Sequence, residues 1–373
     1  MDKTVTMTTT RPGIGTLATA DLGDTPLRRA DIVPHDAGQT APDSRYDRTT
    51  LWYDAFWDAG RITMVAPPLL NLRQALNEAE IRVDGTPVRP RYRNRRARYE
   101  VLDLPAPSPA ARIEIAGPDW RIETGVSHVD REVFAGRNVI VTISRDNDLD
   151  WIGDFARYHR KTQGAEAILF IDNGSTRYGP DEIVDVLGAA GLDGLVLPAP
   201  LPYGPMLKRG AHRHAAKFLR TAMLNLARLR FLATARAILN IDIDELVWSE
   251  GQSVFDMAVR NPLGIAVFTG RWRLPGPSAK PPFRHRDHVW RSVEDHPCPT
   301  KYAVAPGRLA GRMNWDVHRI GPAALRRFWQ RSDAGYWHCA AINTGWKYTA
   351  RLARVGEIRD ERVAADLAAA LAR

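Results

Sequence analysis

The sequence predicts an α/β protein with a mostly parallel sheet and helices on both faces, preceded by a small β-sandwich-like domain. From Asn138 onward, strand-length runs that are apolar throughout alternate with helix-length amphipathic stretches, as in parallel sheets buried between helices. Before that point, residues 48–123 contain short runs separated by Asp-Gly, Pro and Ala-Pro turn signals, which are typical of antiparallel strands.

These two patterns divide the 373 residues into four expected parts. Residues 1–45 carry Thr, Asp, Gly and Pro without periodicity and are expected to be flexible. We expect an all-β domain over 46–135, a catalytic α/β domain over 136–350 and a C-terminal helix over 351–373.

Each element of the α/β part follows from its own pattern. Expected strands and helices alternate, and each strand is apolar enough to be buried on both faces. In order, we expect a strand at 138–144, a helix at 149–163, a strand at 165–172, a helix at 180–191, a strand at 192–198, a helix at about 212–232 and a strand at 235–242.

Composition narrows the classes of function. The two cysteines, Cys298 and Cys339, offer neither a disulfide framework nor a metal-ligand spacing. The sequence has no run of 18 apolar residues and no apolar segment near its start, so we expect a cytoplasmic protein. The net charge is +9, but aromatic residues that could stack on bases are not interleaved with the basic ones, so no nucleic-acid partner is expected.

A cluster of six arginines lies between Arg89 and Arg98. Alternation of Arg89, Arg91 and Arg93 would give one face of a strand a basic surface. This pattern is explained by a solvated edge strand that charge keeps from pairing with other chains. The alternative is an anionic partner, either a polyanionic glycan or the inner face of a membrane bound peripherally.

The segment "ARAILNIDIDELVW" ends an apolar run with Asp242, Asp244 and Glu245. If the strand continued through this segment, Asp242 and Asp244 would point to the same face, where a divalent cation would relieve their repulsion. Asp172 ends an earlier strand. Ligands of an open α/β sheet bind beyond the carboxyl ends of its strands, so all three acids are expected at one site.

This arrangement suits a nucleotide-sugar donor. Asp242 and Asp244 can hold Mn²⁺ or Mg²⁺, which takes its remaining ligands from water and phosphate oxygens and neutralises the leaving diphosphate. Asp172 can accept a hydrogen bond from a ribose hydroxyl or a base N–H, although an aspartate there also fits a turn cap.

Several motifs along the chain carry a family resemblance. The segment "ISRDNDLDWIGDFARYHRKTQGAEAILFIDNGST" resembles the opening of GT-A glycosyltransferases, of the family 2 and family 92-like groups. Later segments resemble further motifs of that family in the same order, namely "LNIDIDELV", "GRWRLPG", "TKYAVAPGRLAGRMNWDVHRI" and "YWHCAAINTGWKYTAR". The matching residues of the opening are Arg145, Trp151, Tyr158, His159, Asp172, Asn173 and Ser175.

The resemblance implies a GT-A fold and a hexosyltransferase that moves a sugar from a nucleotide-sugar donor to a glycan or lipid-linked acceptor. It further implies a role in surface polysaccharide biosynthesis. The donor-binding residues it implies are Ser144, Arg145, Asp172, Asn173, Ser175, Asp242 and Lys301. The metal ligands it implies, for Mn²⁺ or Mg²⁺, are Asp242, Asp244, His318 and His338.

An inverting transfer also needs a base, for which Asp316, Glu294 and Asp295 are candidates. A retaining enzyme would need no such base. His285 and His288, with Asp287 between them, could bind a metal, but we interpret "FRHRDHV" as a charged loop.

Two other functions stay open. One is a non-catalytic protein that binds a glycan or polyanion through the arginines of the all-β domain. The other is a nucleotidyltransferase that uses the same metal chemistry.

Overall fold

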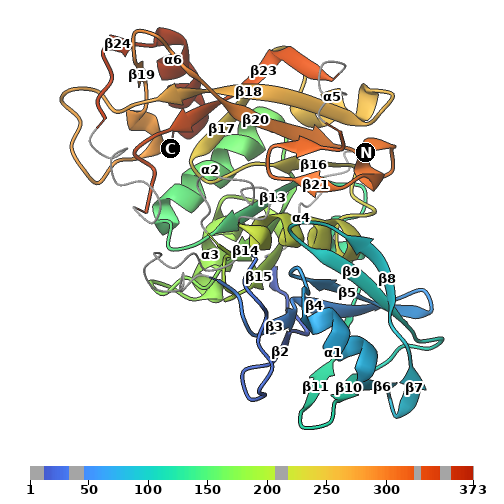
Figure 1. Ribbon diagram of the computed structural model, residues 1–373. Coiled ribbons are helices and arrows are strands. Elements are labelled where there is room, and N and C mark those ends of the chain that lie inside the picture. The colour runs from blue at the N-terminus through green and yellow to red at the C-terminus, as the bar shows by residue number, and fades with distance from the viewer. Residues whose placement is uncertain (1–11, 33–45, 206–216, 323–328, 345–353, 373) are drawn as a thin grey trace. The chain divides into compact units, whose positions relative to one another are not determined.

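The computed structural model describes residues 12–32, 46–205, 217–322, 329–344 and 354–372 (Figure 1). The protein has an α/β fold with a large mixed sheet. The chain divides into two compact units. Unit 1 comprises Met1–Gly15, Glu132–Pro198 and Leu232–Arg373, and unit 2 comprises Thr16–Arg131 and Ala199–Phe231.

A nine-stranded sheet forms the centre of unit 1. The strands β1, β15, β14, β13 and β16 run parallel to one another, whereas β20 is antiparallel to both of its neighbours and β17 is antiparallel to β23. The sheet is therefore mixed, which the uniformly apolar strands alone do not predict. In spatial order its strands are β1 (Gly13–Ile14), β15 (Asp193–Pro198), β14 (Ala167–Asp172), β13 (Asn138–Ser144), β16 (Ala237–Asn240), β20 (Pro297–Val304), β18 (Ile265–Arg273), β23 (Gln330–Cys339) and β17 (Glu245–Ser249).

The register of the parallel strands brings their carboxyl ends together. Ser144 at the end of β13 lies opposite Asp172 at the end of β14. On the other side of β13, Val141 lies opposite Asn240, the last residue of β16. The residues immediately after β16 therefore lie beside Ser144 at the same edge of the sheet.

The helices within unit 1 share one core with one face of this sheet. Alternate strand residues such as Ile140 and Phe170 join that core, while Val141 and Leu169 are buried on the opposite face. In the described part of this unit, the helices that join this core all lie on that face of the sheet. They are α2 (Leu149–Gln163), α3 (Pro180–Ala189), α5 (Val254–Arg260) and α6 (Glu361–Leu371).

Short elements complete unit 1. Two small antiparallel pairs join β19 (Trp290–Arg291) to β24 (Ile358–Arg359) and β21 (Trp315–Asp316) to β22 (Arg319–Ile320). Single 3₁₀ turns are η1 (Glu132–Phe134), η3 (His285–Asp287) and η4 (Ala310–Arg312).

Unit 2 contains two antiparallel-rich sheets whose side chains meet in a common core. Ile113 and Ile115 from one sheet and Met64 and Leu102 from the other belong to the same buried cluster. One sheet is β11 (Arg121–Gly125), β10 (Arg112–Ala116), β6 (Glu80–Val83) and β7 (Thr86–Val88). The other is β12 (Ser127–His128), β4 (Asp54–Asp58), β5 (Arg61–Ala66), β9 (Glu100–Pro105) and β8 (Arg91–Arg95). Unit 2 also contains α1 (Leu72–Glu78) and the antiparallel pair of β2 (Ala20–Asp21) and β3 (Thr50–Trp52).

The N-terminal lead is more structured than its composition indicates. Gly13 and Ile14 pair in parallel with β15, and Arg29 forms a fully buried ion pair with Asp47. Residues 1–11 and 33–45 of the expected flexible segment lie outside the described residues.

The helix expected at about 212–232 is α4 (Phe218–Arg230), and its expected first turns lie outside the described residues. Sequence order suggests that it belongs with the α/β strands on either side. Instead, the segment Ala199–Phe231 belongs to unit 2. Arg230 near its end bonds Asp54 of β4 at 2.7 Å.

The arginine cluster lies on and beside β8, an edge strand of its sheet. Arg89 donates to the carbonyl oxygens of Asn77 and Ala79 where α1 ends, and Arg93 pairs with Asp103 at 3.3 Å. Local contacts therefore engage two of the three alternating arginines.

None of the helices in the described ranges combines the length and the apolar character that crossing a bilayer requires.

Candidate functional site

The acidic residues lie in a tight turn, Asp242–Glu245, which we call the acid turn. The strand β16 ends at Asn240, so the prediction that one strand carries Asp242 and Asp244 on the same face is wrong. The Glu245 N–H donates to the Asp242 carbonyl at 3.0 Å, and the Glu245 carboxylate accepts the Asp242 N–H at 2.9 Å. These reciprocal bonds close the turn before β17 begins.

Lys301, from β20, holds the acid turn from inside the protein. Its ammonium group is fully buried and lies 2.9 Å from a carboxylate oxygen of Asp242 and 2.8 Å from one of Glu245. Sequence reasoning expected Lys301 to contact the donor. Its burial directs its charge to these two acids instead.

His338, from β23, closes the other side of the turn. It lies opposite Glu245 in the β17–β23 register. Its Nε2 is 2.9 Å from Asp244 Oδ2, and its Nδ1 is 3.8 Å from Glu245 Oε1. The indole of Trp272 stacks on the imidazole with ring centroids 3.9 Å apart.

Charge interactions dominate this site. Burial alone would lower the pKa of His338, but the charge and hydrogen bond of Asp244, together with Cys298 and Glu245, raise it to about 10. Burial alone would raise the pKa of Asp244, but the charge and hydrogen bond of His338, together with the charge of Lys301, leave that pKa below its usual value. For Glu245, burial prevails over Lys301 and raises the pKa. Three carboxyl groups thus face two cationic side chains.

Asp244, Glu245 and His338 each offer one ligand atom within 4.8 Å of the other two. The set combines carboxylate oxygens with an imidazole nitrogen, and it can hold a divalent cation such as Mn²⁺ or Mg²⁺ once His338 has lost its proton. Two of these residues are among the ligands expected from the sequence. Glu245 is the third, and its position directly after Asp-Ile-Asp was the available signal.

The loop after β14 forms the neighbouring part of the site. Ser175 donates its hydroxyl to the Asp172 carboxylate and accepts the Asp146 N–H at 2.9 Å. Gly174 makes this return possible because its φ of +73° is a conformation that favours glycine. Burial raises the pKa of Asp172, against the Ser175 hydrogen bonds that lower it.

Three further expected donor residues surround this loop. Ser144 is buried and its hydroxyl accepts from Asn147 at 2.8 Å, while its carbonyl accepts the Asn173 N–H at 2.8 Å. Arg145 is half-exposed and lies 3.7 Å from Asp146. Ser144, Asp172, Asn173 and Ser175 therefore form one hydrogen-bonded group at the carboxyl edge of the sheet.

Other expected site residues lie elsewhere or are engaged. His318 is exposed, and its Nδ1 lies 3.1 Å from the Thr300 carbonyl oxygen, outside the three-residue ligand group. Asp295 pairs with the buried Arg273 at 2.8 Å. Glu294 is largely exposed beside His296.

Asp316, the third candidate base, lies on the hairpin β21–β22. Its carboxylate accepts the Val317 N–H at 2.8 Å. The Val317 carbonyl in turn accepts from Asn240 at 2.9 Å, at the end of the strand that leads into the acid turn. Among the three candidates, Asp316 is the one whose segment is bonded to that strand.

No protein-family model matches the chain, and no curated protein is significantly similar to it. The chemistry of the site is therefore inferred from its own residues. A negative turn with a carboxylate–imidazole ligand set lies beside a polar loop that ends a parallel strand. Such a site can hold a divalent cation next to a bound anion.

Proposed function

We propose that the protein is a metal-dependent glycosyltransferase of the GT-A type. It would move a hexosyl group from a nucleotide-sugar donor to a glycan or lipid-linked acceptor. The observation that carries this proposal is the juxtaposition of the acid turn with the edge formed by Ser144 and Asp172. The strand β13, which ends at Ser144, pairs on one side with β14, which ends at Asp172, and on the other with β16, which leads into the acid turn. A nucleoside diphosphate needs a subsite that holds a cation for its phosphates beside a hydrogen-bonding subsite for its nucleoside.

The residues present fit a divalent cation. Asp244 and His338 would hold it, with Glu245 as a third ligand, since carboxylates suit Mn²⁺ and a deprotonated imidazole can complete the set. When bound, the cation would neutralise charge that develops on the leaving diphosphate. Asp244 and His338 are bonded to each other at 2.9 Å, so each orients the other in the absence of a ligand.

The neighbouring loop would bind the nucleoside. Asp172 is oriented by Ser175, and its carboxylate can accept from a ribose hydroxyl or a base N–H. Ser144, the last residue of β13, and Arg145, which follows it, complete the edge that the donor would face. Arg145 is half-exposed and can therefore reach an anionic ligand.

Lys301 would act on the donor only through the acid turn. Its ammonium group compensates the charges of Asp242 and Glu245 and fixes their carboxylates in one direction. This leaves Asp244, whose side chain is 26% exposed, as the acid of the turn that offers charge to a ligand.

The test is a thermal-shift screen of the full chain with a panel of nucleotide sugars, with and without Mn²⁺. We expect stabilisation by one nucleotide class that requires the cation. Turnover then separates the chemistries, because release of nucleoside diphosphate supports glycosyl transfer and release of pyrophosphate supports nucleotidyl transfer. A screen in which no nucleotide stabilises the protein, with or without Mn²⁺, would overturn the proposal.

A further inference from the structure

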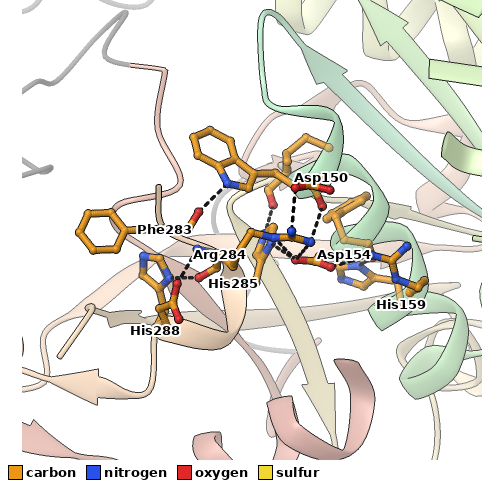
Figure 2. Close-up of polar contacts among 12 residues, drawn as sticks. Asp150, Asp154, His159, Phe283, Arg284, His285 and His288 are labelled. Atoms are coloured by element: carbon orange, nitrogen blue, oxygen red, sulfur yellow. Dashed lines mark hydrogen bonds and ion pairs between the residues drawn. The ribbon is translucent and has the colours of Figure 1, made fainter. Parts of the chain in front are cut away.

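A pair of buried histidines lies beside the acid turn. His285 and His288 belong to the segment Phe283–His288, which we call the histidine turn, and both are fully buried. Figure 2 shows the polar contacts of this segment. The interpretation of this stretch as a charged loop is wrong for both histidines, because each is fully buried and hydrogen-bonded to another segment of the protein.

The histidine turn is fixed to helix α2. Arg284 donates from Nε to Asp154 Oδ2 at 2.9 Å and pairs with Asp150 at 2.7 Å (Figure 2). The indole N–H of Trp151 donates to the Phe283 carbonyl at 2.8 Å. These contacts join the segment to three positions along the first two turns of α2.

His285 reaches from this anchor to the acid turn. Its Nε2 lies 2.9 Å from the carbonyl oxygen of Ile243, the residue between Asp242 and Asp244. A carbonyl oxygen can only accept, so Nε2 carries the hydrogen. The imidazole therefore fixes the peptide that separates the two aspartates.

His288 reaches the segment that comes after His338. Its Nε2 accepts the Ala341 N–H at 3.0 Å, so its Nδ1 carries the hydrogen and donates to the Arg284 carbonyl at 3.0 Å. The two ligand segments are also joined directly, because the Cys339 N–H donates to the Asp244 carbonyl at 2.8 Å.

Both histidines are suited to a permanent structural bond. Burial lowers the pKa of His288 to about 3 and lowers that of His285 as well. Each ring is therefore neutral near pH 7 and supplies one donor and one acceptor. Their hydrogen bonds stay the same throughout the physiological pH range.

We infer that the histidine turn is the positioning element of the metal site, with His285 fixing the acid turn and His288 fixing the segment after His338. Both histidines follow Arg284 in the chain, and the ion pairs of Arg284 hold the histidine turn against α2. This inference rests on the proposed function in that the acid turn binds a divalent cation. Ligand atoms from separate segments must meet within about 0.5 Å of the required geometry, which demands outer contacts of this kind.

His159, on helix α2, provides a matched control. It is also fully buried, and its ring bonds the Phe155 carbonyl at 2.9 Å and the Val247 N–H at 3.2 Å. It contacts neither Ile243 nor Ala341 through these bonds. Its replacement therefore reports the cost of losing a buried imidazole from this core without loss of the histidine turn.

The experiment measures Mn²⁺ affinity by electron paramagnetic resonance titration of the full chain, together with thermal unfolding without metal. We expect His285→Leu and His288→Leu to weaken Mn²⁺ binding about 10- to 100-fold. We expect His159→Leu to lose comparable thermal stability with little change in Mn²⁺ affinity. His285→Gln should recover most of the affinity, because its amide N–H₂ can still donate to Ile243.

Unchanged affinity in His285→Leu, or affinity losses in all three leucine variants that follow their losses of stability, would overturn the inference. If a leucine variant does not fold, His285→Gln is compared with His285→Asn, whose shorter amide cannot reach Ile243. Equal Mn²⁺ affinity in that pair would again overturn it. Failure of the unchanged chain to bind Mn²⁺ would overturn the proposed metal site itself, and this inference with it.

Discussion

Each unit buries a carboxylate against a basic side chain, but the two sites differ in how completely their charges are satisfied. In unit 2, Asp54 accepts from Arg230 at 2.7 Å, from the Ala18 N–H at 2.8 Å and from Ser127 at 3.0 Å. The same arginine donates to the carbonyl oxygens of Thr16 and His128. Arg230 therefore uses its charge and its hydrogen-bond donors on groups of unit 2 itself.

The acid turn of unit 1 is different because three carboxyl groups share Lys301 and His338. Asp242 and Asp244 also keep about a quarter of their side-chain surface exposed. A saturated buried pair contributes to folding and has no capacity for a ligand, whereas an excess of partly exposed carboxylate is costly until a cation binds. The comparison distinguishes a structural ion pair from the proposed binding site.

The largest expected effect is on the saturated pair. Arg230→Met leaves Asp54 buried without its counter-charge, which costs about 3–5 kcal/mol in the free energy of unfolding. Urea denaturation measures this loss. The double variant Arg230→Met with Asp54→Leu should recover a large part of it, because no charge then remains in the core. A single variant as stable as the parent chain would remove the distinction between the two sites.

The acid turn should respond in the opposite way. Asp244→Ala is expected to abolish Mn²⁺-dependent nucleotide binding, yet to change the free energy of unfolding by less than about 1 kcal/mol, because it removes one of three crowded carboxylates. Calorimetric Mn²⁺ titration and urea denaturation measure the two quantities. Asp181→Ala, an exposed acid in the first turn of α3, serves as the control. Metal-dependent turnover at the parental rate would show that Asp244 is not a ligand.

Exposed charges on β8 extend the comparison to the surface. If an anionic membrane is a partner, Arg89, Arg91 and Arg93 would each contribute about 1 kcal/mol to binding of phosphatidylserine vesicles. Association should then weaken steeply as salt rises, since screening acts over about 10 Å at 0.1 M. Vesicle sedimentation of the parent and the triple Ser variant measures this. Absence of association at low salt would leave the arginines as a solvated edge.

The smallest effect concerns a half-exposed pair. The hydrogen bond from Arg236 lowers the pKa of Asp256, assisted by Ser253. A lowered carboxyl pKa stabilises the fold above the unfolded-state pKa, and this contribution is lost as pH falls through the folded-state pKa. Asp256→Asn should therefore cost below about 1 kcal/mol at pH 7, since solvent screens the pair. The difference from the parent should disappear in acid, as thermal unfolding across pH would show.

Local patterns predicted more of the sheet than of the site. Apolar runs located the parallel strands, and the polar residues that end those runs located Asp172 and the acid turn. The prediction of strand across the turn itself is wrong, because alternation cannot reveal that Glu245 closes a hydrogen-bonded turn with Asp242. Contacts between distant segments, such as Lys301 with Glu245, leave no spacing signal in the chain.

The buried histidines show the same limit. His285 and His288 stand among arginines and an aspartate, so their composition indicates a charged loop. Only the packing of α2, the acid turn and the segment after His338 around them gives each imidazole a buried hydrogen-bond partner. A sequence pattern reports the polarity of neighbours along the chain and not of neighbours in space.

The membership of Ala199–Phe231 in unit 2 has a consequence for how the chain can be made and cut. During synthesis, the first part of unit 2 emerges before α4 does, and the strands β13 to β15 of unit 1 are made in the interval. Unit 2 is therefore completed only after unit 1 has begun, and the two cannot fold strictly in succession as independent domains often do. For the same reason, a single cleavage cannot separate them. A chain that starts at Gly136 would retain α4, an amphipathic helix, without Asp54, the buried partner of its Arg230.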